Sequence, residues 1–296
     1  MKQLKGIFPA LLTPFAENQI NESALRSLVE WNIAQGVSGF YVCGSTGEAF
    51  LLTHDERKQV LEIVADQVNG RIRIIAHIGA ISTDLSLDLG HHASSLPGVD
   101  AVSSIPPFYY HFSQEEVIKY YLDLANELAF PVIPYNFPRL SGVTLSPDIV
   151  KELRMNKHII GVKFTSDNFY DLERMKNSDP DLLVYNGFDE MFLAGLSMRA
   201  DGAIGSTFNF MADKYIAIHE AFKTGNIGEA QAIQSQANDV LQALLQTKCF
   251  MAAEKYVIDL IGIPFGEPRR PFIPLTADEK TMLKTKVQPM LKLVLK

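Results

Sequence analysis

The sequence is poor in cysteine, and this scarcity excludes two common ways of stabilising a fold. Among 296 residues only Cys43 and Cys249 are cysteines, with no CxxC pair and no clustering of cysteine with histidine. A disulfide framework and a structural zinc site are therefore not expected. We predict no metal site anywhere in the chain, and a reducing, cytoplasmic location.

Long apolar runs and basic clusters are also missing. No apolar stretch approaches the roughly 20 residues of a membrane-spanning helix. The apolar start of the chain is broken by Pro9 and Pro14, so a first β-strand is favoured over a signal peptide. Lys and Arg number 27 against 34 Asp and Glu, a formal net charge of -7. We therefore predict no membrane partner and no nucleic-acid partner.

What the sequence does contain is a regular alternation of short apolar segments and longer amphipathic ones. Amphipathic patterns such as 21–36, 53–68 and 113–128 predict helices, the last two opened by capping boxes. The predicted strands are residues 6–15, 39–44, 72–79, 98–105, 130–136, 159–164, 182–188 and 201–206. Near-continuous apolar strands that alternate with helices indicate parallel strands buried on both faces.

Eight such strand–helix units predict an α/β fold of the (β/α)8 TIM-barrel type. The rival is a doubly wound sheet, but its usual glycine-rich turns, GxGxxG or GxxxxGK[ST], do not occur. Strand patterns stop near residue 209, and residues 227–246, 249–262 and 276–295 predict helices only. We divide the chain into a barrel that carries the active site, residues 1–224, and a C-terminal helical extension packed on it, residues 225–296.

Lys163 is the most informative residue, because it interrupts the otherwise apolar strand IIGVKF. A lysine is almost never fully buried unless it is paired or functional. Burial disfavours the ammonium form and frees the amine as a nucleophile toward carbonyl groups. The alternative is a strand-end lysine that reaches water or pairs with a carboxylate. The residue alone leaves both interpretations open.

Other polar residues follow the ends of predicted strands, where barrel enzymes carry their active sites. Tyr135 precedes Lys163 by one strand–helix unit and is a candidate proton shuttle or, equally, a packed aromatic. The glycine turn GSTGE supplies Ser45, Thr46 and exposed N–H groups that can hold a carboxylate, or it is an ordinary turn. Asp189 and Glu190 can bind sugar hydroxyls or favour the start of a helix.

Together these segments resemble the N-acetylneuraminate lyase and dihydrodipicolinate synthase superfamily, the pyruvate-dependent class I aldolases. The stretches GSTGEAF, YNFP, GVKFTS, NGFDE and GAIGSTFN occur in the family's order and spacing, from GIFPALLTPF to GEPRRPF. Synthase-like members carry a carboxylate-binding arginine two residues after the proline of YNxP, where this chain has Leu140. Arg139 lies one place earlier and is expected to point elsewhere. The resemblance is therefore to the sialic-acid lyase branch.

The resemblance implies a role for each candidate residue. Lys163 would form a Schiff base with the C2 ketone of open-chain sialic acid, and Tyr135 would relay protons as the C3–C4 bond breaks. Ser45 and Thr46 would hold the substrate carboxylate, and Tyr109 would complete the site of an adjacent subunit. The positions matching contacts to the hydroxylated tail are Thr165, Gly187, Asp189, Glu190 and Ser206.

The same resemblance implies partners and alternatives. The substrates and products would be the small molecules sialic acid, N-acetylmannosamine and pyruvate, no cofactor would be needed, and the assembly would be a homotetramer, a dimer of dimers. A different pyruvate-dependent aldolase or synthase of the superfamily is the first alternative. A catalytically silent barrel used for binding or regulation is the second. Pro134 departs from the family, and a proline within a strand removes a ladder N–H next to Tyr135.

Overall fold

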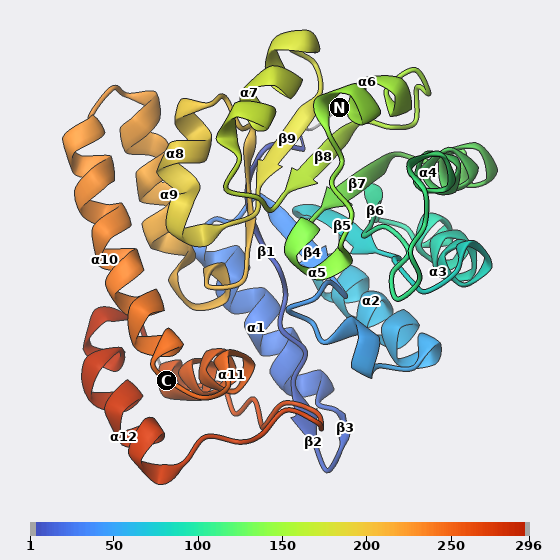
Figure 1. The fold of residues 1–296 in the computed structure, drawn as a ribbon. Helices are drawn as coiled ribbons and strands as arrows, with labels where there is room; N and C mark the ends of the chain where they lie inside the picture. Colours follow the sequence, from blue (N-terminus) through green and yellow to red (C-terminus); the bar gives the residue numbers. More distant parts are fainter. Residues whose placement is uncertain (1–3, 294–296) are drawn as a thin grey trace.

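The computed structural model describes residues 4–293, and its centre is a closed barrel of eight parallel strands (Figure 1). Neighbouring strands pair in the order β1-β10-β9-β8-β7-β6-β5-β4. A parallel bridge between Ala10 and Tyr41 joins the first strand to the last and closes the ring. The barrel strands are β1 (Gly6–Pro9), β4 (Gly39–Val42), β5 (Arg73–His77), β6 (Ala101–Ser104), β7 (Val132–Asn136), β8 (Gly161–Phe164), β9 (Leu183–Asn186) and β10 (Gly202–Gly205). The predicted (β/α)8 barrel is confirmed.

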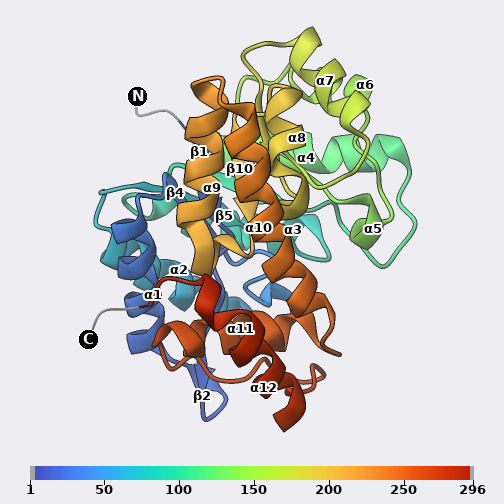
Figure 2. The ribbon, with the colours of Figure 1, turned by 90° about the vertical axis from the view of Figure 1, so that its left-hand side faces the viewer.

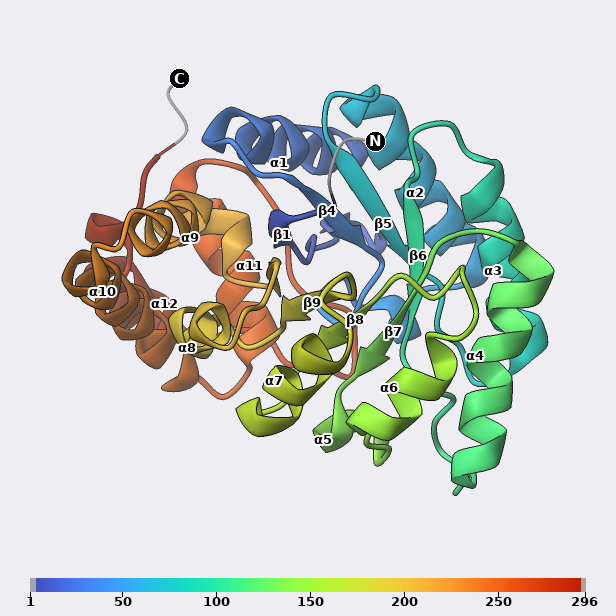
Figure 3. The ribbon, with the colours of Figure 1, turned by 90° about the horizontal axis from the view of Figure 1, so that it is seen from above.

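Helices surround the barrel, as the view from above shows (Figure 3). Polar caps define their starts: Thr53 and Ser113 form the predicted capping boxes of α2 and α4. The helices packed around the barrel are α1 (Glu22–Gln35), α2 (His54–Val68), α3 (Thr83–Ser95), α4 (Gln114–Leu128), α5 (Pro138–Ser141), α6 (Pro147–Leu153), α7 (Phe169–Ser178), α8 (Phe192–Ser197) and α9 (Phe208–Lys223). A small hairpin, β2 (Phe15–Ala16) with β3 (Gln19–Ile20), follows the first strand.

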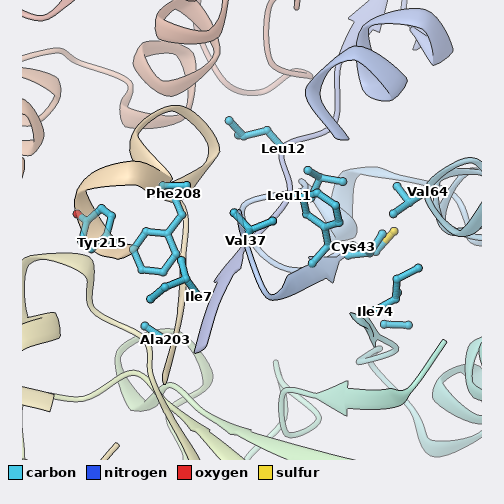
Figure 4. Close-up of a cluster of buried hydrophobic side chains, with 14 of the residues drawn as sticks. Ile7, Leu11, Leu12, Val37, Cys43, Val64, Ile74, Ala203, Phe208 and Tyr215 are labelled. Carbon is cyan, nitrogen blue, oxygen red and sulfur yellow. The ribbon is translucent and has the colours of Figure 1, made fainter. Parts of the chain in front are cut away.

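Side chains alternate between two apolar cores along each strand. One core fills the space between strands and helices, where Ile7, Ala203, Phe208 and Tyr215 pack together (Figure 4). The other fills the barrel interior. The interior core consists of Phe8, Ala10, Tyr41, Ile75, Ala101, Ile105, Ile133, Tyr135, Tyr185 and Ile204. Because successive side chains of a strand point to opposite faces, burying Val162 against the helices turns Lys163 into the barrel.

The predicted C-terminal helices are present as α10 (Ile227–Leu245), α11 (Phe250–Ile261) and α12 (Ala277–Lys286), seen together in Figure 2. The last is shorter than the predicted 276–295. It ends before Pro289, which lacks the N–H that a continuing helix needs. Residues 294 and 295 of that prediction lie outside the described residues. No helix within residues 4–293 has the length and apolarity needed to cross a membrane.

One strand prediction needs correction. The first strand ends at Pro9 rather than residue 15, and the N–H of Leu12 bonds to the side chain of Asn209 instead of a neighbouring strand. Pro134 does not interrupt β7: it sits in register with Ser104, and the next residue, Tyr135, pairs directly with Lys163. The ladder therefore tolerates the missing N–H at this position.

Candidate active site

Lys163 is buried inside the carboxyl end of the barrel, with a side chain that is 4% exposed. Its Nζ lies 3.9 Å from the ring centroid of Tyr135 and 4.3 Å from that of Tyr41. No ion pair joins it to a carboxylate in residues 4–293. Its closest electrostatic partners are therefore aromatic faces, which stabilise an ammonium less than a carboxylate would.

Burial lowers the pKa of Lys163 to about 7, and the charge of Asp189 only partly opposes this effect. Burial likewise raises the pKa of Asp189 to about 6, although hydrogen bonds from Thr207 hold it down in part. A lysine with such a pKa has a substantial fraction of neutral amine at neutral pH. That is the form that attacks a carbonyl carbon.

Tyr135 lies directly beside Lys163 because β7 and β8 pair in that register. Burial raises the pKa of the phenol to about 12, and the nearby hydroxyls of Thr165 and Ser45 lower it in part. The phenol is therefore protonated at neutral pH and can donate a proton to an oxygen bound near Lys163. Thr165 is itself buried, and its hydroxyl lies beside the phenol of Tyr135.

The GSTGE loop is held rigidly from two sides. Gly44 is required because a Cβ there would lie 2.6 Å from the ring of Tyr41. Glu48 is buried and adopts a left-handed backbone conformation with φ of 58°. It forms an ion pair with Lys255 of α11 at 2.5 Å and accepts the backbone N–H of Arg269 at 2.8 Å. The loop between these anchors presents Ser45 and Thr46 to the barrel mouth.

The segment after β9 is held by both the barrel and the C-terminal extension. The carboxylate of Asp189 accepts the N–H and the hydroxyl of Thr207, at 2.8 and 2.6 Å. From α10, the amide of Gln234 donates to the carbonyl of Asp189 at 3.1 Å, and Asn238 donates to the carbonyl of Glu190 at 3.2 Å. Asp189 is thus a buried, anchored acid, whereas Glu190 is half-buried beside the opening.

These groups surround one cavity of about 580 Å³. The predicted residues that line it are Ser45, Thr46, Tyr135, Lys163, Thr165, Gly187, Asp189, Glu190 and Ser206. Tyr109 does not line it. That side chain is 82% exposed and has a left-handed backbone with φ of 80°. The chain therefore does not bring its own Tyr109 into the cavity.

Several cavity residues were not identified from the sequence. Arg139 lines the cavity mouth, so the expectation that it points elsewhere is wrong, and Leu140 lines the mouth beside it. The extension contributes a wall that includes Phe250 and Glu254 of α11. Nothing in the amphipathic pattern of that helix distinguishes an acid facing a cavity from one facing water. Only the packing of the extension against the barrel reveals it.

His77 is a further residue that sequence reasoning missed. Its ring centroid lies 6.2 Å from that of Tyr135. Nε2 accepts the N–H of Ile105, so the proton of the neutral ring is on Nδ1. Nδ1 donates to the carbonyl of Cys43 at 2.9 Å. Burial and the charges of Arg57 and Lys163 lower the pKa of His77 well below its usual range. This neutral imidazole ties the GSTGE loop to β5. Cys43 is a packed thiol whose pKa burial raises to about 11.

The arrangement can perform carbonyl chemistry with the chain's own groups. The cavity is lined by a buried amine, a neighbouring phenol and a loop with hydroxyl and N–H groups. Carboxylic acids line the same cavity. Amine attack, proton transfer and carboxylate binding each have a candidate residue there. Within residues 4–293 no cluster of three or more His, Cys, Asp or Glu side chains is placed to hold a metal ion.

Comparison with known proteins gives a consistent result. The sequence profile of the Dihydrodipicolinate synthetase family matches residues 3–290. The N-acetylneuraminate lyase of Rhizobium meliloti is 45% identical over 98% of this chain and 96% of its own length. The solved structure of CdNal from Clostridium difficile, in complex with mannosamine, is 38% identical with a TM-score of 0.94, covering 97% of this chain and 99% of that one. The N-acetylneuraminate lyase structure from Fusobacterium nucleatum is 37% identical with a TM-score of 0.92, covering 98% and 99%.

Proposed function

The chain belongs to the dihydrodipicolinate synthetase family, and we propose that within this family it is a Schiff-base aldolase that reversibly cleaves N-acetylneuraminate to N-acetylmannosamine and pyruvate. The observation that carries the proposal is the buried Lys163 without a carboxylate partner, in register with Tyr135. Relatives named N-acetylneuraminate lyase, 43% to 45% identical over nearly the whole chain, support the substrate.

In the proposed mechanism the neutral amine of Lys163 attacks the C2 ketone of the open-chain sugar acid. The phenol of Tyr135 donates a proton to the departing oxygen, water leaves, and a protonated imine forms. The phenolate of Tyr135 then takes the proton of the C4 hydroxyl, the C3–C4 bond breaks, and the electron pair of that bond moves into the imine to give an enamine. C4 becomes the aldehyde of N-acetylmannosamine. Protonation of the enamine at C3 and hydrolysis release pyruvate and restore the lysine.

Substrate binding is assigned to the remaining cavity residues. Ser45 and Thr46 hold the carboxylate through hydroxyl and N–H groups, which requires no cation. The hydroxylated tail extends across the cavity toward Asp189 and Glu190. The other groups assigned to the tail are Thr165, Gly187 and Ser206. Leu140 lines the mouth where a synthase would need an arginine, which favours the lyase over dihydrodipicolinate synthesis.

The proposal extends to assembly and location. An apolar groove of about 350 Å³ beside the mouth is lined by Phe50, Phe108 and Phe272, and the exposed Tyr109 follows Phe108. Apolar surface of this kind is typical of protein interfaces. A second copy of the chain would cover it and supply Tyr109 to the cavity, within a homotetramer. Two free, buried thiols suit a cytoplasmic protein of carbohydrate metabolism.

The proposal is tested by incubating the protein with N-acetylneuraminate and measuring pyruvate release with a coupled lactate dehydrogenase. We expect steady release by the wild type and none by Lys163→Ala. If the wild type releases no pyruvate but still forms a borohydride-trapped adduct with pyruvate, its substrate is a different 2-keto acid of the same reaction class. If neither release nor trapping occurs, the barrel is not an aldolase.

A further inference from the structure

Glu254 is a buried acid in the cavity wall that the proposed mechanism leaves unused. It lies on α11, is 1% exposed, and lines the same cavity as Lys163. Its Oε1 has no hydrogen-bond partner within residues 4–293. The hydroxyl of Ser206 lies close enough to lower the pKa of Glu254, but burial outweighs this contact and raises the pKa to about 8.

Two other buried acids are paired with lysines, whereas no cation within residues 4–293 pairs with Glu254. Glu48 pairs with Lys255, the residue next to Glu254 in the sequence, and Asp201 pairs with Lys176 at 2.9 Å. Lys255 therefore points to the GSTGE loop and leaves its neighbour without a cation. A buried carboxyl that no cation compensates is unfavourable for folding, since its desolvation is not offset. Its position in the cavity wall indicates that a molecule bound in the cavity supplies a further donor.

The position of Glu254 in the cavity indicates which part of a bound molecule carries the hydrogen-bond donor. The carbonyl carbon of the substrate must lie at Lys163, in the centre of the barrel. Glu254 belongs to the wall contributed by the extension, next to Ser206 and within the electrostatic reach of Asp189. Those two residues are already assigned to the hydroxylated tail. A short 2-keto acid held at Lys163 would have no donor groups at that wall, whereas a long sugar acid would.

We propose that Glu254 is a specificity-determining residue that accepts a hydrogen bond from a hydroxyl group at the end of the substrate distant from Lys163. This inference rests on the proposed aldolase function and deepens it. It predicts that the enzyme selects long, polyhydroxylated aldehydes as partners of pyruvate. The residue takes no part in forming or breaking bonds.

The test compares two aldehydes in the condensation direction, with pyruvate as the common partner. Glyceraldehyde is too short to reach the wall, and N-acetylmannosamine is long enough. Glu254→Leu should raise the KM for N-acetylmannosamine about tenfold to a hundredfold, which is the effect of losing one hydrogen bond to a buried acid. The KM for glyceraldehyde and the rate of borohydride trapping with pyruvate should stay unchanged.

Two further variants keep the test decisive. Glu254→Gln preserves shape and one acceptor oxygen, so it should fold normally and raise the KM for N-acetylmannosamine less than Glu254→Leu. Glu127→Gln makes the same chemical change on the exposed face of α4 and should alter neither KM. Equal effects on both aldehydes, or no effect on either, would overturn the inference. A wild type that condenses pyruvate with neither aldehyde would instead refute the proposed function, on which the inference depends.

Discussion

Two buried lysines near opposite ends of the barrel differ in their partners. Lys176, on α7, is 3% exposed and lies near the amino ends of the strands. Its Nζ pairs with Asp201 at 2.9 Å and donates to the carbonyls of Pro180 and Leu182 at 2.9 and 2.7 Å. Lys163, equally buried at the carboxyl ends, has aromatic rings instead. The paired lysine holds loops together, and the unpaired one is free to react.

The difference shows how one fold keeps the same residue type inert in one place and reactive in another. Surrounding an ammonium with a carboxylate and two carbonyls compensates its desolvation. Burial without such partners lowers the pKa, as it does for Lys163. Barrel enzymes place chemistry at the carboxyl ends and stability at the amino ends, and these two lysines follow that division.

The largest expected effect is the loss of catalysis on substitution of the unpaired lysine. Lys163→Met should reduce pyruvate release from N-acetylneuraminate at least about 10⁴-fold, since no other group can form the imine. Thermal unfolding should show an equal or higher Tm, because an uncompensated buried amine is replaced by an apolar chain of similar length. A variant that unfolds would show that Lys163 is needed for the fold.

The matching change at the paired lysine should act on stability instead. Lys176→Met removes the buried one of two cations that pair with Asp201, the other being the half-exposed Lys5 at 2.8 Å. It should lower the free energy of unfolding by about 1 to 3 kcal/mol, measured by urea denaturation. The activity per folded molecule should be unchanged. A fall in kcat without a loss of stability would contradict the assignment of stability to the amino ends of the strands and catalysis to their carboxyl ends.

Next in size is the effect of removing the phenol beside the reactive amine. Tyr135→Phe keeps the ring that packs against Lys163 but removes the proton donor, so kcat should fall about 10²- to 10⁴-fold. The KM for N-acetylneuraminate should change far less. Tyr185→Phe is the control. Tyr185 lies on the strand on the other side of Lys163, and its buried hydroxyl donates to the carbonyl of Leu4. Its loss should leave kcat within a few-fold of the wild-type value.

The smallest effect is the pH dependence of the first step. The neutral amine attacks, and the pKa of Lys163 is about 7, so the initial rate of trapping with pyruvate should rise from pH 6 to pH 8 and then level off. The fraction of neutral amine increases roughly tenfold over this interval. A rate that continues to rise toward pH 10 would show that the lysine keeps its ordinary pKa.

Much of the fold could be predicted from the sequence, because short apolar segments alternate with longer amphipathic ones in eight strand–helix units. The apolar strand IIGVKF drew attention to Lys163, but only the structure shows that Val162 packs against the helices and Lys163 enters the barrel. The motifs also located the loops that line the cavity. The end of α12 was misplaced because an apolar pattern continues beyond Pro289, where the hydrogen-bonding requirement of a helix outweighs it.

The rest of the site depends on tertiary packing that no local pattern encodes. Glu254 lies on a helix whose neighbours Lys255 and Ala253 are also buried, so its position toward the cavity is set by how α11 docks on the barrel. Arg139 follows a proline in a four-residue helix, too short for a periodicity to indicate its direction. Asp189 looked like a free sugar ligand, yet one of its oxygens is engaged by Thr207.

The most direct test of the central claim, that the unpaired lysine is the nucleophile, is reductive trapping with pyruvate and borohydride followed by peptide mass mapping. We predict one reduced pyruvyl group per chain, carried by the peptide that contains Lys163, with Lys176 and Lys255 unmodified. A wild-type protein that is not trapped, or an adduct on another lysine, would contradict the claim.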